Sequence, residues 1–137
     1  MILVDTGPLV AMFDRQDSRH ASCVATLKTF REPLRTTIPV LTEAFHVLTP
    51  QGREADALRD FIARDGLAVW FLDRDSVTRA FELMERYADH PMDLADASLV
   101  VAAESLETRM VFTIDRTDFS TYRIRRGHRH YAFEVLA

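Results

Sequence analysis

The segment MILVDTGPLV, residues 1–10, joins an apolar run to the start of a helix. The run MILVD has the length and composition of a short buried strand that ends at Asp5. Thr6 then stands two positions before Pro8, which predicts a helix with Thr6 as its N-cap and the proline in its first turn. A strand that leads directly into a helix is typical of an α/β fold.

The same alternation continues along the chain. Two further apolar runs predict strands at residues 67–72 and 110–115, and residues 130–136 form a possible last strand. A short extended piece is expected to enter a helix near Pro39. The remaining helices are expected within residues 17–30, 52–66 (closed by Gly66), 74–88 and 93–109. Strands that alternate with helices predict an α/β sandwich with a mostly parallel central sheet flanked by helices.

The composition is typical of one globular domain, which we expect to span residues 1–137. Of the 137 residues 47% are hydrophobic, and the net charge of −4 argues against a uniformly basic nucleic-acid binder. The one cysteine, Cys23, excludes an internal disulfide and a multi-cysteine zinc site. No segment has the pattern of a signal peptide or the roughly 20 apolar residues of a membrane span. We therefore expect a cytoplasmic protein with no membrane partner.

Several acidic residues stand where a parallel sheet usually binds ligands. Two predicted strands end in an aspartate, Asp5 and Asp115, at the carboxyl edge where ligands of open α/β sheets lie. Either aspartate alone is better explained by a turn or a helix cap. Glu43 shares a predicted helix face with Val40 and Val47, and a glutamate in an apolar stripe is seldom unpaired. The partner of Glu43 is either a metal cation or the side chain of one of the many arginines.

The segment DLADASLVVAAE, residues 93–104, raises the same question for Asp96. Asp93 after Pro91 is a good helix N-cap, with Asp96 as the N3 residue of a capping-box-like pair. Asp96 also shares a helix face with apolar side chains at Leu99, Val100 and Ala103. Capping therefore explains Asp93 well and Asp96 only in part.

Taken together, the four acids Asp5, Glu43, Asp96 and Asp115 come from four separate predicted elements. A doubly wound sheet could bring them to one edge, where they would repel one another unless a cation neutralises them. Ligands that are all oxygen suit Mg²⁺ or Mn²⁺ rather than zinc. Such ions activate water and stabilise phosphoryl oxygens, which points to phosphodiester hydrolysis.

The order of four motifs, VDTGPL, LTEAFHVL, DLADASLVVAAE and FTIDRTDF, resembles the PIN domain over essentially the whole chain. The closest likeness is to the VapC-type ribonuclease toxins of bacterial toxin–antitoxin pairs. The resemblance implies a PIN-like three-layer sandwich and a Mg²⁺- or Mn²⁺-dependent endoribonuclease that is dimeric and held inactive by a cognate antitoxin. It assigns the metal and catalytic positions to Asp5, Glu43, Asp96 and Asp115. It also assigns auxiliary positions to Thr6, Asp93, Thr113 and Asp118.

The stretch RTDFSTYRIRRGHRH, residues 116–130, holds five arginines, two histidines and one acid. Arginine suits bidentate contacts to phosphate, so we expect RNA contacts here. The candidates are Arg116, Arg123, Arg125 and Arg126. A compositional bias is the alternative, because Lys28 is the only lysine among the 17 cationic residues. His128 and His130 fit a surface or RNA contact better than a metal ligand.

Other functions fit the sequence less well. A phosphatase of the haloacid dehalogenase type needs a second aspartate two residues after the first, where this chain has Gly7. A response-regulator receiver needs an adjacent acidic pair and a late lysine, and both are missing. A non-catalytic PIN-like RNA-binding or scaffold module is the alternative from another class, but RNA phosphates gain nothing from buried acids. A structure-specific DNA nuclease is the nearer enzymatic alternative.

Overall fold

A computed structural model describes residues 1–137. Its main sheet has five parallel strands in the order β3-β2-β1-β4-β7. The strands are β1 Ile2–Val4, β2 Leu34–Thr37, β3 Ala68–Trp70, β4 Met110–Phe112 and β7 Glu134–Leu136. The α/β class with a central parallel sheet is confirmed. The order places β1 at the centre, so the residues that follow β1 and β4 emerge side by side.

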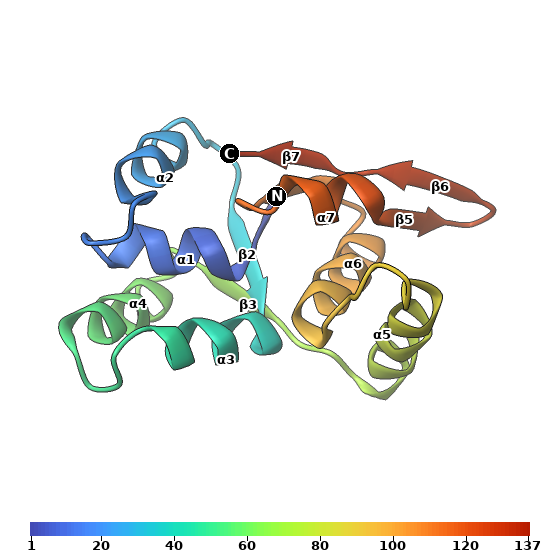
Figure 1. The fold of residues 1–137 in the computed structure, drawn as a ribbon, viewed down its shortest axis with the longest axis horizontal. Coiled ribbons are helices and arrows are strands. Elements are labelled where there is room, and N and C mark those ends of the chain that lie inside the picture. Colours follow the sequence, from blue (N-terminus) through green and yellow to red (C-terminus); the bar gives the residue numbers. More distant parts are fainter.

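Seven helices surround this sheet. They are α1 Thr6–Phe13, α2 His20–Leu27, α3 Ile38–Val47, α4 Arg53–Ala63, α5 Arg74–Arg86, α6 Leu94–Leu106 and α7 Arg116–Thr121. In Figure 1, α1, α2 and α4 lie on one side of the sheet and α5 and α6 on the other. Helix α3 packs against both α1 and α6. None of these helices has the length and apolar character that crossing a membrane would require.

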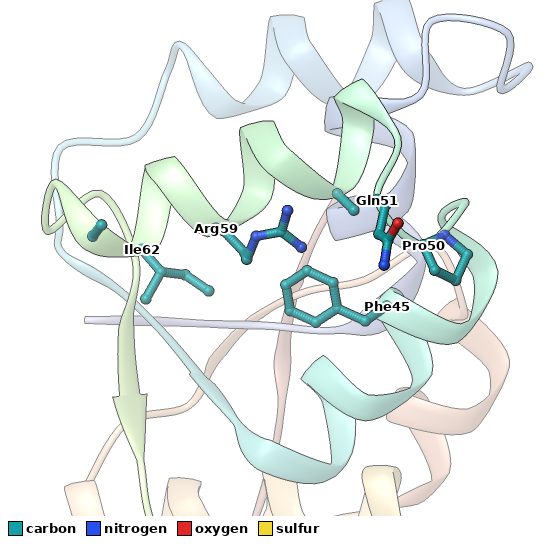
Figure 2. Close-up of a pocket in the computed structure, with 7 residues that line it drawn as sticks. Phe45, Pro50, Gln51, Arg59 and Ile62 are labelled. Carbon is teal, nitrogen blue, oxygen red and sulfur yellow. The ribbon is translucent and has the colours of Figure 1, made fainter.

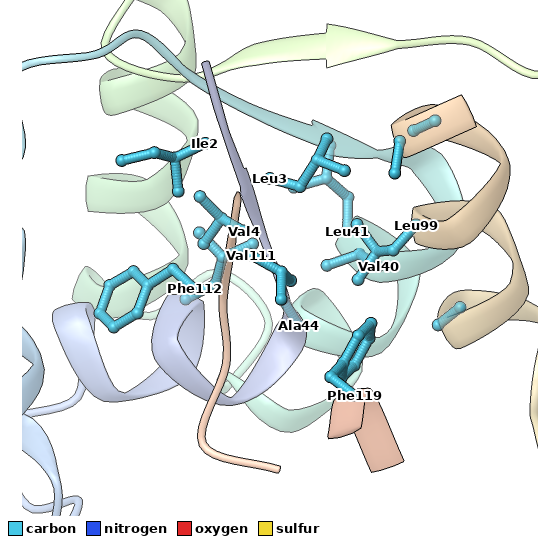
Figure 3. Packing of buried hydrophobic residues seen from close by; sticks show 14 of the residues in the cluster. Ile2, Leu3, Val4, Val40, Leu41, Ala44, Leu99, Val111, Phe112 and Phe119 are labelled. Carbon is cyan, nitrogen blue, oxygen red and sulfur yellow. The ribbon is translucent and has the colours of Figure 1, made fainter. Parts of the chain in front are cut away.

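The core forms because the central strands are apolar on both faces. Ile2, Leu3 and Val4 are almost completely buried, as a strand covered on both sides of a parallel sheet requires. Figure 3 shows Ile2 and Phe112 pointing to one side of the sheet, and Leu3 pointing to the other. Helices α3 and α6 meet the second side with side chains such as Leu41 and Leu99. The core therefore holds the first turns of α1, α3 and α6 close to the end of β1.

The start of α1 differs from the prediction by one residue. Asp5 is the N-cap, with extended backbone angles, and its Oδ1 accepts a hydrogen bond of 2.8 Å from the Thr6 backbone N–H. The prediction of Thr6 as the cap was wrong, because Asp5 both ends the strand and caps the helix. Gly7 makes a close approach to Ile114, since a Cβ at position 7 would lie 2.6 Å from the Ile114 side chain and would force it to shift. This contact brings the residues after β4 against the start of α1.

The last quarter of the chain contains elements that the sequence did not predict. The arginine-rich stretch forms α7 and then an antiparallel hairpin of β5 Arg123–Arg126 and β6 Arg129–Ala132. The predicted strand 130–136 was wrong as a single element, because its residues divide between β6 and β7 in two different sheets. Gly127 has a φ of 63°, which a glycine adopts without strain in the hairpin turn.

Candidate metal and catalytic site

The acidic residues singled out in the sequence gather at the carboxyl edge of the sheet. Asp5 follows β1, Thr113 and Asp115 follow β4, and Asp93 and Asp96 stand at the start of α6. Glu43 projects from the middle of α3. Hydrogen bonds and charge interactions join these residues into one connected site, which is described below from its centre outward.

Asp5 is the buried centre of this site, with 8% of its surface exposed. Its Oδ1 accepts from the Thr6 backbone N–H, and its Oδ2 accepts from the Thr113 hydroxyl at 2.8 Å. The Thr113 Oγ1 in turn accepts from the backbone N–H of Asp115 at 2.9 Å. Thr113 therefore links the end of β1 to the end of β4, which fixes the Asp5 carboxylate in one orientation.

Glu43 reaches the same site from α3. Its Oε1 accepts a hydrogen bond of 2.8 Å from the Thr6 hydroxyl, which the sequence had placed as an auxiliary group. Val40 on the same helix is fully buried, whereas Val47 is exposed, so the apolar stripe predicted around Glu43 is only partly present. No ion pair in the structure includes Glu43. The alternative of an arginine partner for Glu43 is therefore wrong in this structure.

Asp93 and Asp96 have different tasks at the start of α6. Asp93 is the N-cap, and its Oδ1 accepts from the Asp96 backbone N–H at 2.8 Å, as predicted. The Asp96 side chain does not reach back to close a capping box. Its Oδ2 instead accepts a hydrogen bond of 2.9 Å from the hydroxyl of Tyr122, which lies after α7. Asp96 therefore belongs to the site as well as to the helix.

The electrostatic neighbours of these carboxylates are mainly one another. Burial, followed by the charges of Glu43 and Asp93, raises the pKa of Asp5 to about 6, against the hydrogen bonds from Thr113 and Thr6. Burial, and then the charges of Asp93 and Asp5, raises the pKa of Asp96 to about 7. Burial and Asp93 also raise the pKa of Glu43. The charge of Asp93 therefore raises the pKa of all three carboxyl groups, although the resemblance assigned Asp93 only an auxiliary position.

Asp115 and Asp118 form an outer pair at the start of α7. Asp115 is the N-cap of this helix, and its Oδ1 accepts from the Asp118 backbone N–H at 3.1 Å. The neighbouring Asp115 carboxyl and burial raise the pKa of Asp118, and its hydrogen bond with the His90 ring lowers it. Asp118 is also one of the charges that raise the pKa of Asp96. Asp115 thus joins the site through Thr113 and Asp118 rather than through a direct contact with Asp5.

The candidate RNA-binding arginines lie outside this group of acids. Arg116 and the hairpin residues Arg123, Arg125 and Arg126 are all exposed. The Arg125 backbone N–H donates to Glu104 on α6 at 2.8 Å, and Glu104 also forms a two-point ion pair with Arg79 on α5. This little-exposed pair ties the hairpin to α6, so the arginine side chains are carried on a fixed support.

Two cavities lie beside α3, and only one of them is lined by acids of the site. A recess of about 520 Å³ lies between the starts of α3 and α6, and Glu43 and Asp93 are among its lining residues. A groove of about 640 Å³ lies between α3 and α4 and is lined mainly by apolar groups such as Phe45 and Ile62 (Figure 2). Arg59 is the only charged residue among those that line this groove.

The sequence matches the profile of the PIN domain over residues 2–124. The chain belongs to the PIN-domain family. It is 28% identical to the ribonuclease VapC26 of Mycobacterium tuberculosis over 134 residues, which are 93% of this chain and 96% of the relative. The resemblance drawn from the four motifs is confirmed at the level of the family.

Two solved structures share the fold of this PIN domain. Mycobacterium tuberculosis VapC20, described as a sarcin–ricin loop cleaving toxin, aligns with a TM-score of 0.78 at 20% identity, over 85% of this chain and 92% of that one. A toxin–antitoxin complex from Klebsiella pneumoniae aligns with a TM-score of 0.67 at 18% identity, over 88% of this chain and 92% of that one. The PIN-like fold class is confirmed by these alignments.

The side chains of this PIN domain fit a hard divalent cation by their chemistry. The central groups are all carboxylates, and none of the ion pairs in the structure includes Asp5, Glu43, Asp93 or Asp96. Asp5 is buried, and Glu43 and Asp96 are half-buried. These three carboxyl groups have raised pKa values and no cationic partner, which makes them favourable ligands for Mg²⁺ or Mn²⁺. No three His, Cys, Asp or Glu side chains form a ready-made set of metal ligands in this structure.

Sequence reasoning missed two residues of this PIN domain that contact the acids. Tyr122 donates to Asp96, and the His90 ring pairs with Asp118. Burial and the Asp96 charge raise the pKa of Tyr122, so its hydroxyl stays protonated and donates. The available signal was helical spacing, because Asp115, Phe119 and Tyr122 fall four and seven positions apart on one face of a helix. This helix, α7, lies in the arginine-rich stretch and was not predicted.

Proposed function

We propose that this PIN domain is an endoribonuclease that hydrolyses RNA phosphodiester bonds with Mg²⁺ or Mn²⁺, and that it is the toxin of a toxin–antitoxin pair. The observation that carries the proposal is the group of Asp5, Glu43, Asp93 and Asp96, which are electrostatically linked and have no cationic partner. Such a group is costly in a fold that has no use for it. A purely RNA-binding or scaffold module would gain nothing from it.

The proposed chemistry assigns a different task to each side chain. Asp5 and Asp96, with Asp115 at the outer edge, supply carboxylate oxygens for the cation. When bound, the cation would polarise the phosphoryl oxygens and make water more acidic. Glu43 is held by the Thr6 hydroxyl and has a raised pKa, so it is suited to orient the attacking water and accept its proton. Asp93 and Asp118 keep the field of the site negative, and Thr113 holds Asp5.

RNA is the proposed substrate for two reasons, which are the names of the relatives and the positions of the exposed arginines. VapC26 is named a ribonuclease, and VapC20 is described as cleaving the sarcin–ricin loop. Arg123 directly follows Tyr122, which contacts Asp96, and the hairpin leads from there along α6. Arg125 and Arg126 therefore lie farther from the acids, at positions where they would contact phosphates beyond the cleaved bond. Arg116, at the first position of α7, is the proposed contact nearest to Asp115.

A small antitoxin is the proposed protein partner. The solved relative from Klebsiella pneumoniae is a toxin–antitoxin complex, which supports a partner of this kind. An acidic site with no cationic group of its own is a natural target for an arginine or lysine side chain of such a protein. The expected homodimer stays a prediction, which sedimentation velocity of the purified chain would measure.

Cleavage assays on RNA and DNA of the same sequence test this function. We expect cleavage of RNA with Mg²⁺ or Mn²⁺, no cleavage in EDTA, and loss of activity in Asp5→Asn. Asp73→Asn is the control, because Asp73 is also a helix N-cap whose carboxylate accepts from a backbone N–H, and it lies outside the site. Cleavage of DNA alone would favour the structure-specific DNA nuclease. Binding of RNA without cleavage under any metal would favour the non-catalytic module.

A further inference from the structure

We propose that Tyr122 is a positioning residue that holds Asp96 in the orientation required to bind the divalent cation. The proposal rests on the proposed function, because it assumes that a cation binds at the carboxylates. It adds a residue to which no role was assigned by the motifs of the sequence. Tyr122 is fully buried, and its hydroxyl donates to Oδ2 of Asp96 at 2.9 Å.

The hydrogen bond divides the two oxygens of Asp96 between two tasks. Oδ2 accepts from Tyr122, while Oδ1 has no hydrogen-bond partner within the chain. Asp96 stands on the first turn of α6, and its backbone is already fixed by the bond from its N–H to the Asp93 cap. With Oδ2 tethered, the carboxylate plane can no longer rotate freely, and Oδ1 is held as a ligand oxygen. Outer groups of this kind orient metal ligands in many proteins.

The Tyr122 ring is itself held from three sides by aromatic rings. The ring centroids of Tyr87, Phe119 and His90 lie 5.2, 5.3 and 5.9 Å from that of Tyr122, all close to edge-on. Edge-to-face packing of this kind fixes the direction of a ring as well as burying it. The backbone N–H of Tyr122 also donates to the carbonyl of Asp118 at 3.1 Å, which ends α7. A side chain so constrained can transmit a fixed position to its partner.

A neutral donor suits this place better than a charged one would. An arginine or lysine on Oδ2 would neutralise Asp96 and compete with the cation for it. The Tyr122 hydroxyl satisfies one oxygen and leaves the negative charge of the carboxylate in place. This agrees with the lack of any ion pair at Asp96 in a chain that has 17 lysine and arginine residues.

The experiment compares Tyr122→Phe with Tyr87→Phe in the full chain. Both substitutions remove one hydroxyl from the same aromatic cluster and keep the ring. The Tyr87 hydroxyl accepts from the Arg123 backbone N–H at 3.0 Å and does not touch a carboxylate of the site. Calorimetric titration with Mn²⁺ measures the cation affinity directly, without any cleavage. Melting in EDTA, measured separately, reports what each hydroxyl contributes to the fold.

We expect Tyr122→Phe to weaken Mn²⁺ binding by about tenfold or more, as is typical for outer-sphere partners of metal ligands. Tyr87→Phe should leave the affinity unchanged. Cleavage by Tyr122→Phe should recover when the Mn²⁺ concentration is raised, because the ligands themselves remain. If the wild type binds Mn²⁺ and Tyr122→Phe binds it equally well, the positioning role is overturned and the proposed function stands. If the wild type binds neither Mn²⁺ nor Mg²⁺, the proposed function falls, and the role of Tyr122 falls with it.

Discussion

Tyr122 donates its hydroxyl hydrogen to Oδ2 of Asp96 over 2.9 Å, and this bond connects the end of α7 to the first turn of α6. Asp96 therefore faces a donor from another element rather than its own helix terminus. A capping side chain accepts a hydrogen bond from a backbone N–H at the start of its helix. The Asp96 side chain accepts no such bond. The charge of this residue then acts mainly on the neighbouring carboxylates, which leads to a prediction about stability.

Asp96→Asn should raise the melting temperature of the metal-free protein. At about pH 8 and in EDTA, the Asp96 carboxylate is repelled by the charges of Asp93 and Asp5, and the substitution removes the charge of Asp96 while keeping an oxygen for Tyr122. The gain should shrink in acid, where Asp96 of the wild type is protonated. Mg²⁺ should stabilise the wild type more than the variant. Differential scanning calorimetry with and without Mg²⁺ measures both effects.

Asp73→Asn is the control for this experiment. Asp73 caps α5 as Asp93 caps α6, and the hydrogen bonds from Ser76 lower the pKa of Asp73, whereas the pKa of Asp96 is raised. The control should not gain stability in EDTA. The contrary result is an Asp96→Asn variant that melts lower than the wild type in EDTA and cleaves RNA normally. That result would show that Asp96 acts only at the end of the helix.

The stability of the metal-free wild type should fall as the pH rises from about 4 to about 8. The pKa values of Asp5 and Asp96 in the folded protein, about 6 and about 7, lie above the usual value of 3.8. The folded state therefore binds more protons than the unfolded state in this range, so stability is lost as protons leave. The loss should be on the order of a few kcal/mol. Urea unfolding at several pH values in EDTA measures it, and a flat profile would contradict the raised pKa values.

Arg125→Ala combined with Arg126→Ala should weaken RNA binding and flatten its dependence on salt. If both side chains contact phosphates, the slope of log K against log salt concentration should become shallower by about 1 for each lost contact. The matched control is Arg59→Ala combined with Arg64→Ala. Arg59 lies on α4 and Arg64 is its C-cap, and each exposed arginine pairs with an aspartate of α4. If both double variants bind RNA equally well at low salt, the arginine-rich stretch reflects only a compositional bias.

A neighbouring gene should encode a small protein that inhibits this PIN domain. We expect a helical or extended segment with arginine or lysine, since the acidic site offers no cation of its own. Co-expression should restore growth, and a complex should form in gel filtration. A gene that stands alone, and whose expression leaves growth unaffected, would remove most support for the toxin part of the proposal.

The sequence predicted the parts of the site that depend on strand ends and helix starts. Asp5 and Asp93 are local signals, because an apolar run before an aspartate and a proline before a cap act over a few residues. The position of Tyr122 could not be predicted in this way, since its partner Asp96 is 26 positions away and meets it only through tertiary packing. The division of residues 130–136 between two sheets has the same cause, because β7 is defined by its pairing with β4.

The chemical ends of the RNA fragments test the central proposal most directly. Attack of water on phosphorus forms a bond from the water oxygen to phosphorus and breaks the bond to the 3′ oxygen, which leaves with a proton. The products would then carry a 5′-phosphate and a 3′-hydroxyl, and they should form with Mg²⁺ and not in EDTA. A ribonuclease that uses the 2′-hydroxyl as nucleophile gives a 2′,3′-cyclic phosphate instead. Cyclic-phosphate ends, or undiminished cleavage in EDTA, would contradict a cation site built on Asp5, Asp96 and Asp115.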